Sequence, residues 1–386
     1  MSGVDKIRVM HLLAPITFAG AERVAVTLLR CLDRDRFEPS VCLQLNARRP
    51  DELTARELRR LGLEPETIFL KKTFEWRQVK ELAAIIKRER IDVLHTHGYR
   101  TDVTGYLASK LAPVKLVATA HGWITNSRKA RFYHLLQKLA LRSFDQVIAV
   151  SEPIAAELRR CGVKRLIKIA NAVELPSAAA ESDLRRQLGL APQAQLIGTV
   201  GRLSPEKGLH HLLEAAVKLS ADLPEALFLI VGDGPARTEL EALSASLGLS
   251  GRVIFHGYCA DVAQVYPALD LFVLPSLTEG MPMALLEALS YGVPVVATRV
   301  GEVPALLGDG RGRLVSPGRP EELAQAISGL LADPAAARAM AGRARQHLAE
   351  HYSLEAWRKQ IEGVYEKVLA AGPAPVNAYT PKGAAA

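Results

Sequence analysis

Short apolar runs alternate with amphipathic segments along almost the whole chain. Runs of about four to eight apolar residues are typical of buried strands, and apolar positions recurring every three to four residues are typical of helices with one buried face. The alternation predicts parallel sheets with helices on both faces, in which ligands bind at the carboxyl ends of the strands. The segments expected in the first half are strands at 7–14, 41–45, 91–95, 116–120 and 147–150 and helices at 20–32, 53–61, 77–90, 103–111 and 128–142.

Two such α/β units are expected, because 386 residues are long enough for two hydrophobic cores. The alternation stops at the Ala-rich stretch P-S-A-A-A-E-S-D and restarts at Gln195. The expected division is a first domain over 1–175, a linker over 176–190, a second domain over 191–352, a last helix over 353–371 and a disordered tail over 372–386.

Positive charge is concentrated in the first domain. Lys and Arg outnumber Asp and Glu by 31 to 19 in residues 1–175, whereas 18 face 22 in the remainder. A basic half predicts an anionic partner, which leaves nucleic acid, an acidic membrane surface or a phosphate-bearing substrate. Aromatic residues make up 5% of the chain, which argues against base-stacking platforms and hence against nucleic acid.

The cysteines and the first residues predict a cytoplasmic protein. Cys31, Cys42, Cys161 and Cys259 are scattered without a C-x-x-C spacing, which favours reduced thiols and no structural zinc. The N-terminal residues contain an acidic group and no long apolar core, so we interpret them as a strand rather than a signal peptide. No apolar stretch approaches the roughly 20 residues that a membrane span needs.

Residues 275–297 carry the most specific pattern of the chain, with a strand, a loop, a helix and a strand in succession. The helix is expected to begin near Pro282, and its free backbone N–H groups and dipole suit a phosphate. Glu279 precedes the helix and Glu287 lies inside it, with seven residues between them. The two carboxylates can accept hydrogen bonds from two sets of sugar hydroxyls. The alternative is that Glu279 caps the helix and Glu287 is a solvated helix residue.

Further polar residues follow the other strands of the second half. Arg202 and Lys207 flank a glycine-bearing loop, where a guanidinium fork and an ammonium suit a diphosphate. Gly232 and Asp233 form a turn at the end of the next strand, and Tyr258 ends a further strand, where it can lie against a base. Neither glycine turn completes G-x-G-x-x-G, which argues against a nicotinamide-binding fingerprint. Surface cations remain the simpler interpretation of the Arg–Lys pair by itself.

The first half offers a glycine and three histidines at its strand ends. Gly20 lies where the first strand gives way to its helix, and a glycine there lets the backbone approach an oxyanion. His121 follows a buried strand and can donate a hydrogen bond into a cleft. His95 and His97 are two residues apart and, with His121, raise the question of a metal site. No carboxylate stands at matching spacing, so we predict hydrogen-bonded histidines and no metal.

Residues 128–142 mix basic side chains with Phe132, Leu135, Leu136 and Leu139 at helical spacing. Such a helix can lie on an anionic membrane. The alternative, a helix with its apolar residues on the core and a charged outer face, is the one we favour from the sequence.

The second half resembles the donor domain of the family 4 glycosyltransferases, which have the GT-B fold. The resemblance is carried by V-G-R-L-S-P-E-K-G, V-G-D-G-P, F-H-G-Y, L-P-S-L-T-E-G-M-P-M-A-L-L-E-A-L and G-V-P-V-V-A-T, in this order. The first half matches more loosely, through A-G-A-E-R, H-T-H, T-A-H-G and V-S-E. The resemblance implies two Rossmann-like domains that face each other across a cleft, with the last helix crossing back onto the first domain.

The resemblance also implies a role for each candidate residue in binding a nucleotide-sugar donor. The diphosphate would meet two cations, the sugar one carboxylate and the backbone beside it, and the ribose the second carboxylate. The residues so implied are His121, Arg202, Lys207 and Glu279 at the reacting sugar and diphosphate, and Gly20, Gly232, Asp233, Tyr258, Gly280, Met281, Met283 and Glu287 elsewhere around the donor.

The implied reaction is a retaining, metal-independent transfer of a hexose to a glycan or to a polyprenyl- or other lipid-linked acceptor. Fixed cations and helix N-termini can stabilise the leaving diphosphate without a metal or other cofactor. Cell-surface polysaccharide, lipopolysaccharide or glycolipid synthesis at the inner face of the membrane is the expected setting. A sugar-nucleotide epimerase or hydrolase of the same fold, and a non-catalytic nucleotide-sugar-binding protein, remain alternatives.

Overall fold

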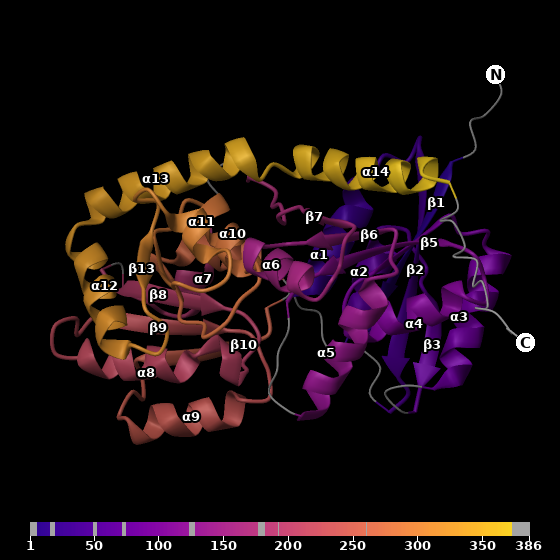
Figure 1. Cartoon of the computed structure of the whole chain (residues 1–386). Helices are drawn as coiled ribbons and strands as arrows, with labels where there is room; N and C mark the ends of the chain where they lie inside the picture. Colours follow the sequence, from indigo (N-terminus) through magenta and orange to yellow (C-terminus); the bar gives the residue numbers. More distant parts are fainter. Residues whose placement is uncertain are drawn as a thin grey trace, which may run out of the picture.

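Two parallel sheets, each covered by helices on both faces, make up the computed structural model (Figure 1). The structure describes residues 6–15, 20–48, 52–71, 75–122, 128–176, 182–191, 193–259 and 261–372, with the backbone alone for 128–130. The predicted disordered tail lies outside the described residues except for Gly372.

The first domain is built on a seven-stranded sheet. Its elements are β1 (Ile7–Leu13), α1 (Gly20–Cys31), β2 (Phe37–Asn46), α2 (Glu52–Arg60), β3 (Glu66–Leu70), α3 (Trp76–Arg88), β4 (Val93–Thr96), α4 (Tyr99–Ser109), β5 (Lys115–Ala120), α5 (Arg128–Leu141), β6 (Gln146–Ala149), α6 (Glu152–Arg160) and β7 (Leu166–Lys168). The strand order is β3-β2-β1-β4-β5-β6-β7, and every pair is parallel. The order reverses direction beside β1, which places the ends of β1 and β4 where such sheets bind ligands.

The second domain has a six-stranded sheet with the order β10-β9-β8-β11-β12-β13. Its elements are α7 (Leu184–Gln187), β8 (Gln195–Val200), η1 (Pro205–Lys207), α8 (Leu209–Lys218), β9 (Ala226–Val231), α9 (Arg237–Ser246), β10 (Val253–Gly257), η2 (Val262–Gln264), η3 (Tyr266–Ala268), β11 (Leu271–Leu274), α10 (Met283–Ser290), β12 (Val295–Thr298), α11 (Val303–Leu307), β13 (Arg313–Val315), α12 (Pro320–Ala332), α13 (Pro334–His351) and α14 (Leu354–Ala370).

The predicted two-sheet organisation is confirmed, although the sequence analysis missed both edge strands of the first sheet. β3 alternates buried and exposed residues, and β7 is largely exposed, so neither shows the continuous apolar run of an inner strand. The segment predicted as a linker contains the short helix α7, whose Leu184 is buried.

Helix α14 crosses from the second domain to the first, as predicted. Figure 1 shows α13 over the second domain and α14 continuing over the first sheet. Trp357, Ile361 and Tyr365 of α14 are buried against Val9 of β1 and Leu28 of α1. A hydrophobic core therefore joins the end of the chain to its beginning.

Helix α5 buries a polar side chain, Gln137, and turns three large apolar side chains outward. Gln137 is buried and donates a hydrogen bond to Asp102 of α4 at 2.7 Å. Phe132, Leu135 and Leu139 are 57%, 55% and 45% exposed. The favoured interpretation from the sequence, with these residues on the core, is therefore wrong. Periodicity locates an apolar face but does not say which way the face points.

Asp102 of α4 has a fully buried carboxyl group that contacts α5. Burial raises its pKa to about 7, although hydrogen bonds from Thr96 and Gln137 act in the opposite direction. Thr96 Oγ1 donates to one carboxyl oxygen at 2.5 Å, and Gln137 donates to the other. The group ties α4 to β4 and α5.

In the part of the chain that the structure describes, no helix is both long and apolar enough to cross a membrane.

Candidate functional site

The predicted donor residues gather where the carboxyl ends of strands from both sheets meet. The loop after β11 leads through Glu279 and Gly280 to Pro282, which caps α10. Backbone of the first domain lies directly opposite: a methyl group added at Gly280 would be 2.3 Å from the carbonyl oxygen of His121. Only glycine allows this approach, so the two domains touch at the start of α10.

Lys207 and Glu279 form an ion pair at this junction. The Lys207 Nζ lies 2.7 Å from Glu279 Oε1, and Ser276 Oγ donates to the same oxygen at 2.7 Å. The Glu279 side chain is 8% exposed and that of Lys207 is 26% exposed. Lys207 belongs to η1 and Glu279 to the loop after β11, so the pair joins these two segments.

Arg202 stands beside this pair and is held by a second carboxylate. Its guanidinium donates to Glu206 Oε1 at 2.7 Å, and Ser204 Oγ donates to the same oxygen. Burial raises the pKa of Glu206, but the hydrogen bonds from Ser204 and Arg202 outweigh it, so the pKa of this carboxyl is lowered. Glu206 therefore stays charged and keeps the guanidinium in one position.

Glu287 is shared between the two domains. Arg23 of α1 donates to its Oε1 at 2.9 Å, and the buried Tyr266 donates to its Oε2 at 2.6 Å. Neither Arg23, which is 264 positions from Glu287, nor Tyr266, which is 21 positions away, was predicted as a partner from the sequence. Arg23 stands three residues after Gly20, so the helix that begins with this glycine turns a cation toward the second domain.

A hollow of about 220 Å³ opens between the domains next to Glu287. It is lined from the second domain by Tyr258 and Met283 and from the first by Arg23 and Thr27, among others. Tyr258 is 38% exposed and presents its ring to this space. Gly20 lies nearby, since a methyl group added there would be 4.0 Å from Met283 Cγ.

Gly232 and Asp233 lie at the end of β9, on the far side of Arg202. Gly232 has φ +134°, and a methyl group there would be 1.9 Å from the carbonyl oxygen of Gly201. The position thus requires glycine for packing of the two loops. Asp233 is 58% exposed and accepts a hydrogen bond from the backbone of Gly234, so it contacts its own turn.

Two further contacts join the domains on the other side of Gly280. The backbone N–H of Asn171 donates to Met281 Sδ at 3.1 Å. Lys168 of β7 pairs with the buried Glu302, which also accepts a hydrogen bond from the backbone of Glu152 at 3.0 Å. The junction is thus held on both flanks.

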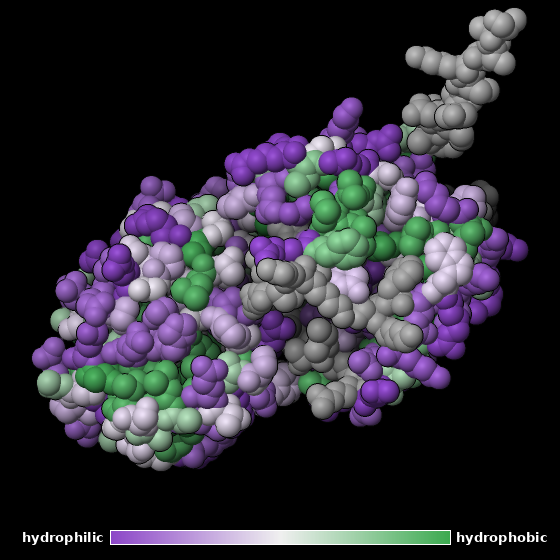
Figure 2. Space-filling model, turned by 60° about the horizontal axis from the view of Figure 1, so that its bottom comes forward, coloured by the Kyte–Doolittle hydropathy of each residue, from purple (hydrophilic) through white to green (hydrophobic). Residues whose placement is uncertain are grey.

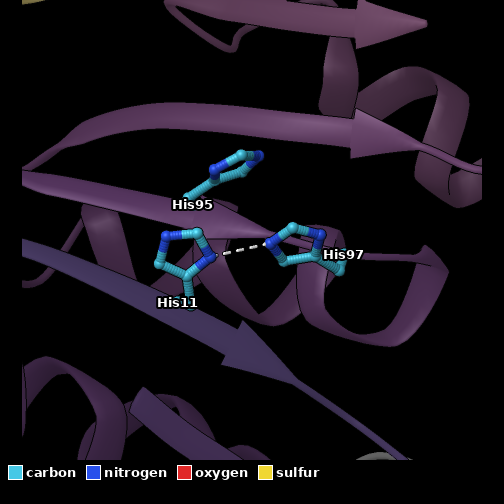
Figure 3. A group of neighbouring side chains, drawn as sticks. All are labelled: His11, His95 and His97. Carbon is cyan, nitrogen blue, oxygen red and sulfur yellow. Dashed lines mark hydrogen bonds between the residues drawn. The ribbon is translucent and has the colours of Figure 1, made fainter. Parts of the chain in front are cut away.

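Three histidines of the first domain, His11, His95 and His97, form a buried cluster next to His121. His97 Nδ1 lies 3.3 Å from His121 Nε2, and His97 Nε2 lies 3.0 Å from His11 Nδ1. Figure 3 shows His95 beside the bonded pair of His11 and His97. The expected hydrogen bonding is present, and His11 is a member that the sequence analysis missed. The ring nitrogens of His11, His95 and His97 lie within 4.8 Å of one another, so these three are the residues that could hold a metal ion.

Comparisons with known proteins agree with this arrangement. The family described as Glycosyltransferase Family 4 matches residues 18–193, and the one described as Glycosyl transferases group 1 matches residues 180–347. The alpha-D-kanosaminyltransferase of Streptomyces kanamyceticus is 31% identical over 283 residues, which cover 68% of this chain and 73% of that protein. The UDP-Gal:alpha-D-GlcNAc-diphosphoundecaprenol alpha-1,3-galactosyltransferase of Escherichia coli is 27% identical over 317 residues, 77% of this chain and 80% of that one.

A solved structure supports the same conclusion. Anabaena Alr3699/HepE in complex with UDP-glucose superposes with a TM-score of 0.83 and 25% identity, covering 94% of this chain and 100% of that one. The predicted GT-B architecture is confirmed by this likeness and by the two sheets. The chain belongs to glycosyltransferase family 4.

Proposed function

We propose that this glycosyltransferase moves a sugar from a nucleoside diphosphate donor to a glycan or lipid-linked acceptor, with retention of configuration and without a metal ion. The observation that carries the proposal is the Lys207–Glu279 pair before α10, next to Gly280 and the His121 backbone of the other domain, with Arg202 lining the same pocket as Lys207 and Ser276. Two fixed cations and the free N–H groups of a helix start are the partners that a diphosphate requires.

The proposed chemistry follows from where charge develops. Negative charge grows on the distal phosphate as the bond to the sugar breaks, and preorganised cations stabilise it at no cost in reorganisation. Arg202 and Lys207 take this role, and Glu279 binds hydroxyls of the transferred sugar. Retention follows if the acceptor attacks on the face that the diphosphate leaves, with the leaving phosphate accepting the proton of the acceptor hydroxyl.

Uridine diphosphate sugars are the first donors to test. The Anabaena protein was crystallised with UDP and with UDP-glucose, and the Escherichia coli enzyme uses UDP-Gal by its name. Thermal-shift measurements with UDP-, GDP- and ADP-glucose separate the bases, and stabilisation by one nucleotide at concentrations above its Kd is expected. Stabilisation by none of the three would reject the donor assignment. The anomeric configuration of the product, measured by NMR, tests retention.

The exposed face of α5 supports an acceptor at a membrane. Phe132, Leu135 and Leu139 point outward beside the exposed Arg131, and a helix face that combines apolar and basic side chains can bind anionic lipid surfaces. Figure 2 shows hydrophobic residues gathered in patches on one face of an otherwise hydrophilic molecule. The Escherichia coli relative acts on a diphosphoundecaprenol-linked sugar by its name. Peripheral attachment to the inner face of the membrane is therefore part of the proposal.

Sedimentation with vesicles tests the attachment. The protein is expected to bind vesicles that contain phosphatidylglycerol and to leave neutral phosphatidylcholine vesicles in the supernatant. Leu135→Glu should abolish binding, whereas Val217→Glu, at an exposed apolar position on α8, should not. Equal vesicle binding by both variants would refute the proposed membrane attachment through α5, but it would not bear on the proposed donor site.

A further inference from the structure

The strands β1, β4 and β5 each change from apolar to polar on the same face. Val9 is followed two residues later by His11, Val93 by His95, and Val117 by Thr119. Residues two apart in a strand share a face, and His11 and His95 are also paired in register. This face lies under α1 and α14, where Val9, Val93 and Val117 belong to the hydrophobic core. The polar row therefore lies inside the protein at the carboxyl ends of the strands.

The polar row and a tyrosine of α14 form one continuous chain of hydrogen bonds. Tyr365 Oη lies 3.3 Å from His11 Nε2 and 2.7 Å from His95 Nδ1, and His95 Nε2 lies 2.8 Å from Thr119 Oγ1. The other end runs from His11 through His97 to His121. We refer to these side chains as the histidine relay: Thr119, His95, Tyr365, His11 and His97.

The rings of the relay are neutral at physiological pH. Burial lowers the pKa of His11 to about 3 and that of His121 to about 4. Burial, followed by the neighbouring histidines, lowers the pKa values of His95 and His97 well below the usual value. Each ring then has one N–H and one lone pair, so each donates one hydrogen bond and accepts another.

With one proton per group, the hydrogen bonds of the relay can all point in one direction or all in the other. In the first, His121 donates through Nε2 into the relay, every link points the same way, and Nδ1 of His121 presents a lone pair. In the second, every proton is reversed and Nδ1 carries the hydrogen. A mixed order between two rings would bring two N–H groups or two lone pairs face to face, and a mixed order at Tyr365, whose oxygen can accept from both neighbouring rings, would leave its O–H without a partner; either costs about 1–3 kcal/mol for each buried group left unpaired. The links are therefore coupled.

We propose that the histidine relay sets which ring nitrogen of His121 carries the proton and ties that choice to the position of helix α14. This inference rests on the proposed function in one respect: it takes the His121 ring to lie beside the transferred sugar, as the resemblance to family 4 implies. The relay members are positioning residues, because none of them lines the hollow of about 220 Å³ beside Glu287. Through Tyr365, the fit of α14 on the first domain determines whether His121 donates to the sugar or accepts from it.

A metal centre at His11, His95 and His97 is the competing interpretation. A zinc ion would need a lone pair from each ring at about 2.0–2.1 Å. The bonds that His11 makes to His97 and that His95 makes to Tyr365 already use these nitrogens. The group contains no carboxylate among the described residues, so two positive charges would be buried without a counter-charge. The completed hydrogen bonds favour the relay.

Nitrogen NMR of histidine-labelled protein tests the relay without any assay of transfer. One neutral tautomer of His121 is expected to dominate in the unmodified protein. Tyr365→Phe removes a single oxygen from the middle of the chain and should shift the tautomer balance of His121, although the two residues do not touch. Tyr352→Phe, at a half-buried tyrosine outside the relay, is the matched control. Unchanged His121 nitrogens in a folded Tyr365→Phe protein would overturn the proposal.

Kinetics then test whether the relay serves the reaction. UDP release from UDP-glucose by Tyr365→Phe should show a kcat about ten- to a hundredfold lower, the loss seen when hydrogen-bond partners that orient metal-binding histidines are removed, with KM nearly unchanged. His97→Gln keeps a donor and an acceptor and should retain more activity than His97→Leu at matched thermal stability. Equal losses in these two variants would count against the relay. Absence of UDP-glucose binding to the unmodified protein would reject the donor assignment and leave the NMR result to decide the relay.

Adding zinc distinguishes the histidine relay from a metal centre. Calorimetry with zinc chloride is expected to show no stoichiometric binding that depends on His11. Stoichiometric binding that His11→Asn abolishes, with altered ring nitrogens of His95 and His97, would replace the relay by a metal centre.

Discussion

Replacing Lys207 by methionine tests the donor site most informatively, because the change removes one charge and keeps the length of the side chain. Among the described residues, the variant leaves Glu279 with the hydrogen bond from Ser276 alone, in a position where its side chain is 8% exposed. Loss of a partner from a largely buried charged group costs about 1–3 kcal/mol. Since a kcal/mol corresponds to about 2–4 °C for domains of this size, the second domain should melt several degrees lower.

The same change should weaken nucleotide binding. A charge-assisted hydrogen bond contributes about 1.5–3 kcal/mol, so the affinity for UDP should fall about ten- to a hundredfold. The unpaired Glu279 adds repulsion toward the diphosphate. Isothermal titration calorimetry with UDP measures the first effect, and thermal unfolding measures the loss of stability.

The double variant Lys207→Met/Glu279→Gln separates folding from binding. Removing both charges eliminates the uncompensated carboxylate, so stability should return most of the way while the affinity for UDP stays low. Lys218→Met is the control, because Lys218 makes an exposed ion pair with Glu321 that is worth at most about 1 kcal/mol. Unchanged UDP affinity in Lys207→Met would refute the assignment, whatever happens to the melting temperature.

Three further predictions follow from other parts of the molecule. Gly280→Ala should abolish UDP release from UDP-glucose, because its methyl group would be 2.3 Å from the His121 carbonyl oxygen; Gly342→Ala, with open space around it, should be active. Asp102 binds a proton in the folded protein up to a pH of about 7 but loses it near pH 4 when unfolded, so its contribution to stability falls as pH rises across this range. Asp102→Asn should lack this decline. Melting temperatures that change with pH in the same way in both proteins from pH 5 to 8 would contradict the raised pKa of Asp102. Leu135→Glu should retain UDP-glucose turnover in solution while it loses vesicle binding; loss of turnover would show that α5 also supports the donor site.

Much of the fold could be predicted because inner strands of a parallel sheet are apolar throughout. β9 and β11 were predicted for this reason, whereas β3 and β7 are edge strands with exposed residues and were missed. The outward face of α5 could not be predicted, since its polar inner face depends on the buried carboxyl of Asp102. A helix that buries Gln137 and exposes Leu135 reverses the usual preference.

The candidate site was predictable where its residues are close in sequence. Glu279, Glu287 and the start of α10 lie within one short segment, and their arrangement follows from helix geometry. The partners of Glu287 come from elsewhere: Arg23 is 264 positions away. The histidine relay could not be predicted for the same reason, since Tyr365 and His11 are 354 positions apart. The one local signal was the repeated Val-x-His or Val-x-Thr at the ends of three strands.

A crystal structure with UDP is the decisive experiment for the donor site. Electron density for the diphosphate is expected between Arg202, Lys207 and the backbone N–H groups that precede Met283, with the ribose directed toward Glu287. Well-defined density for UDP at any other place on the protein, with this space empty, would contradict the proposed donor site.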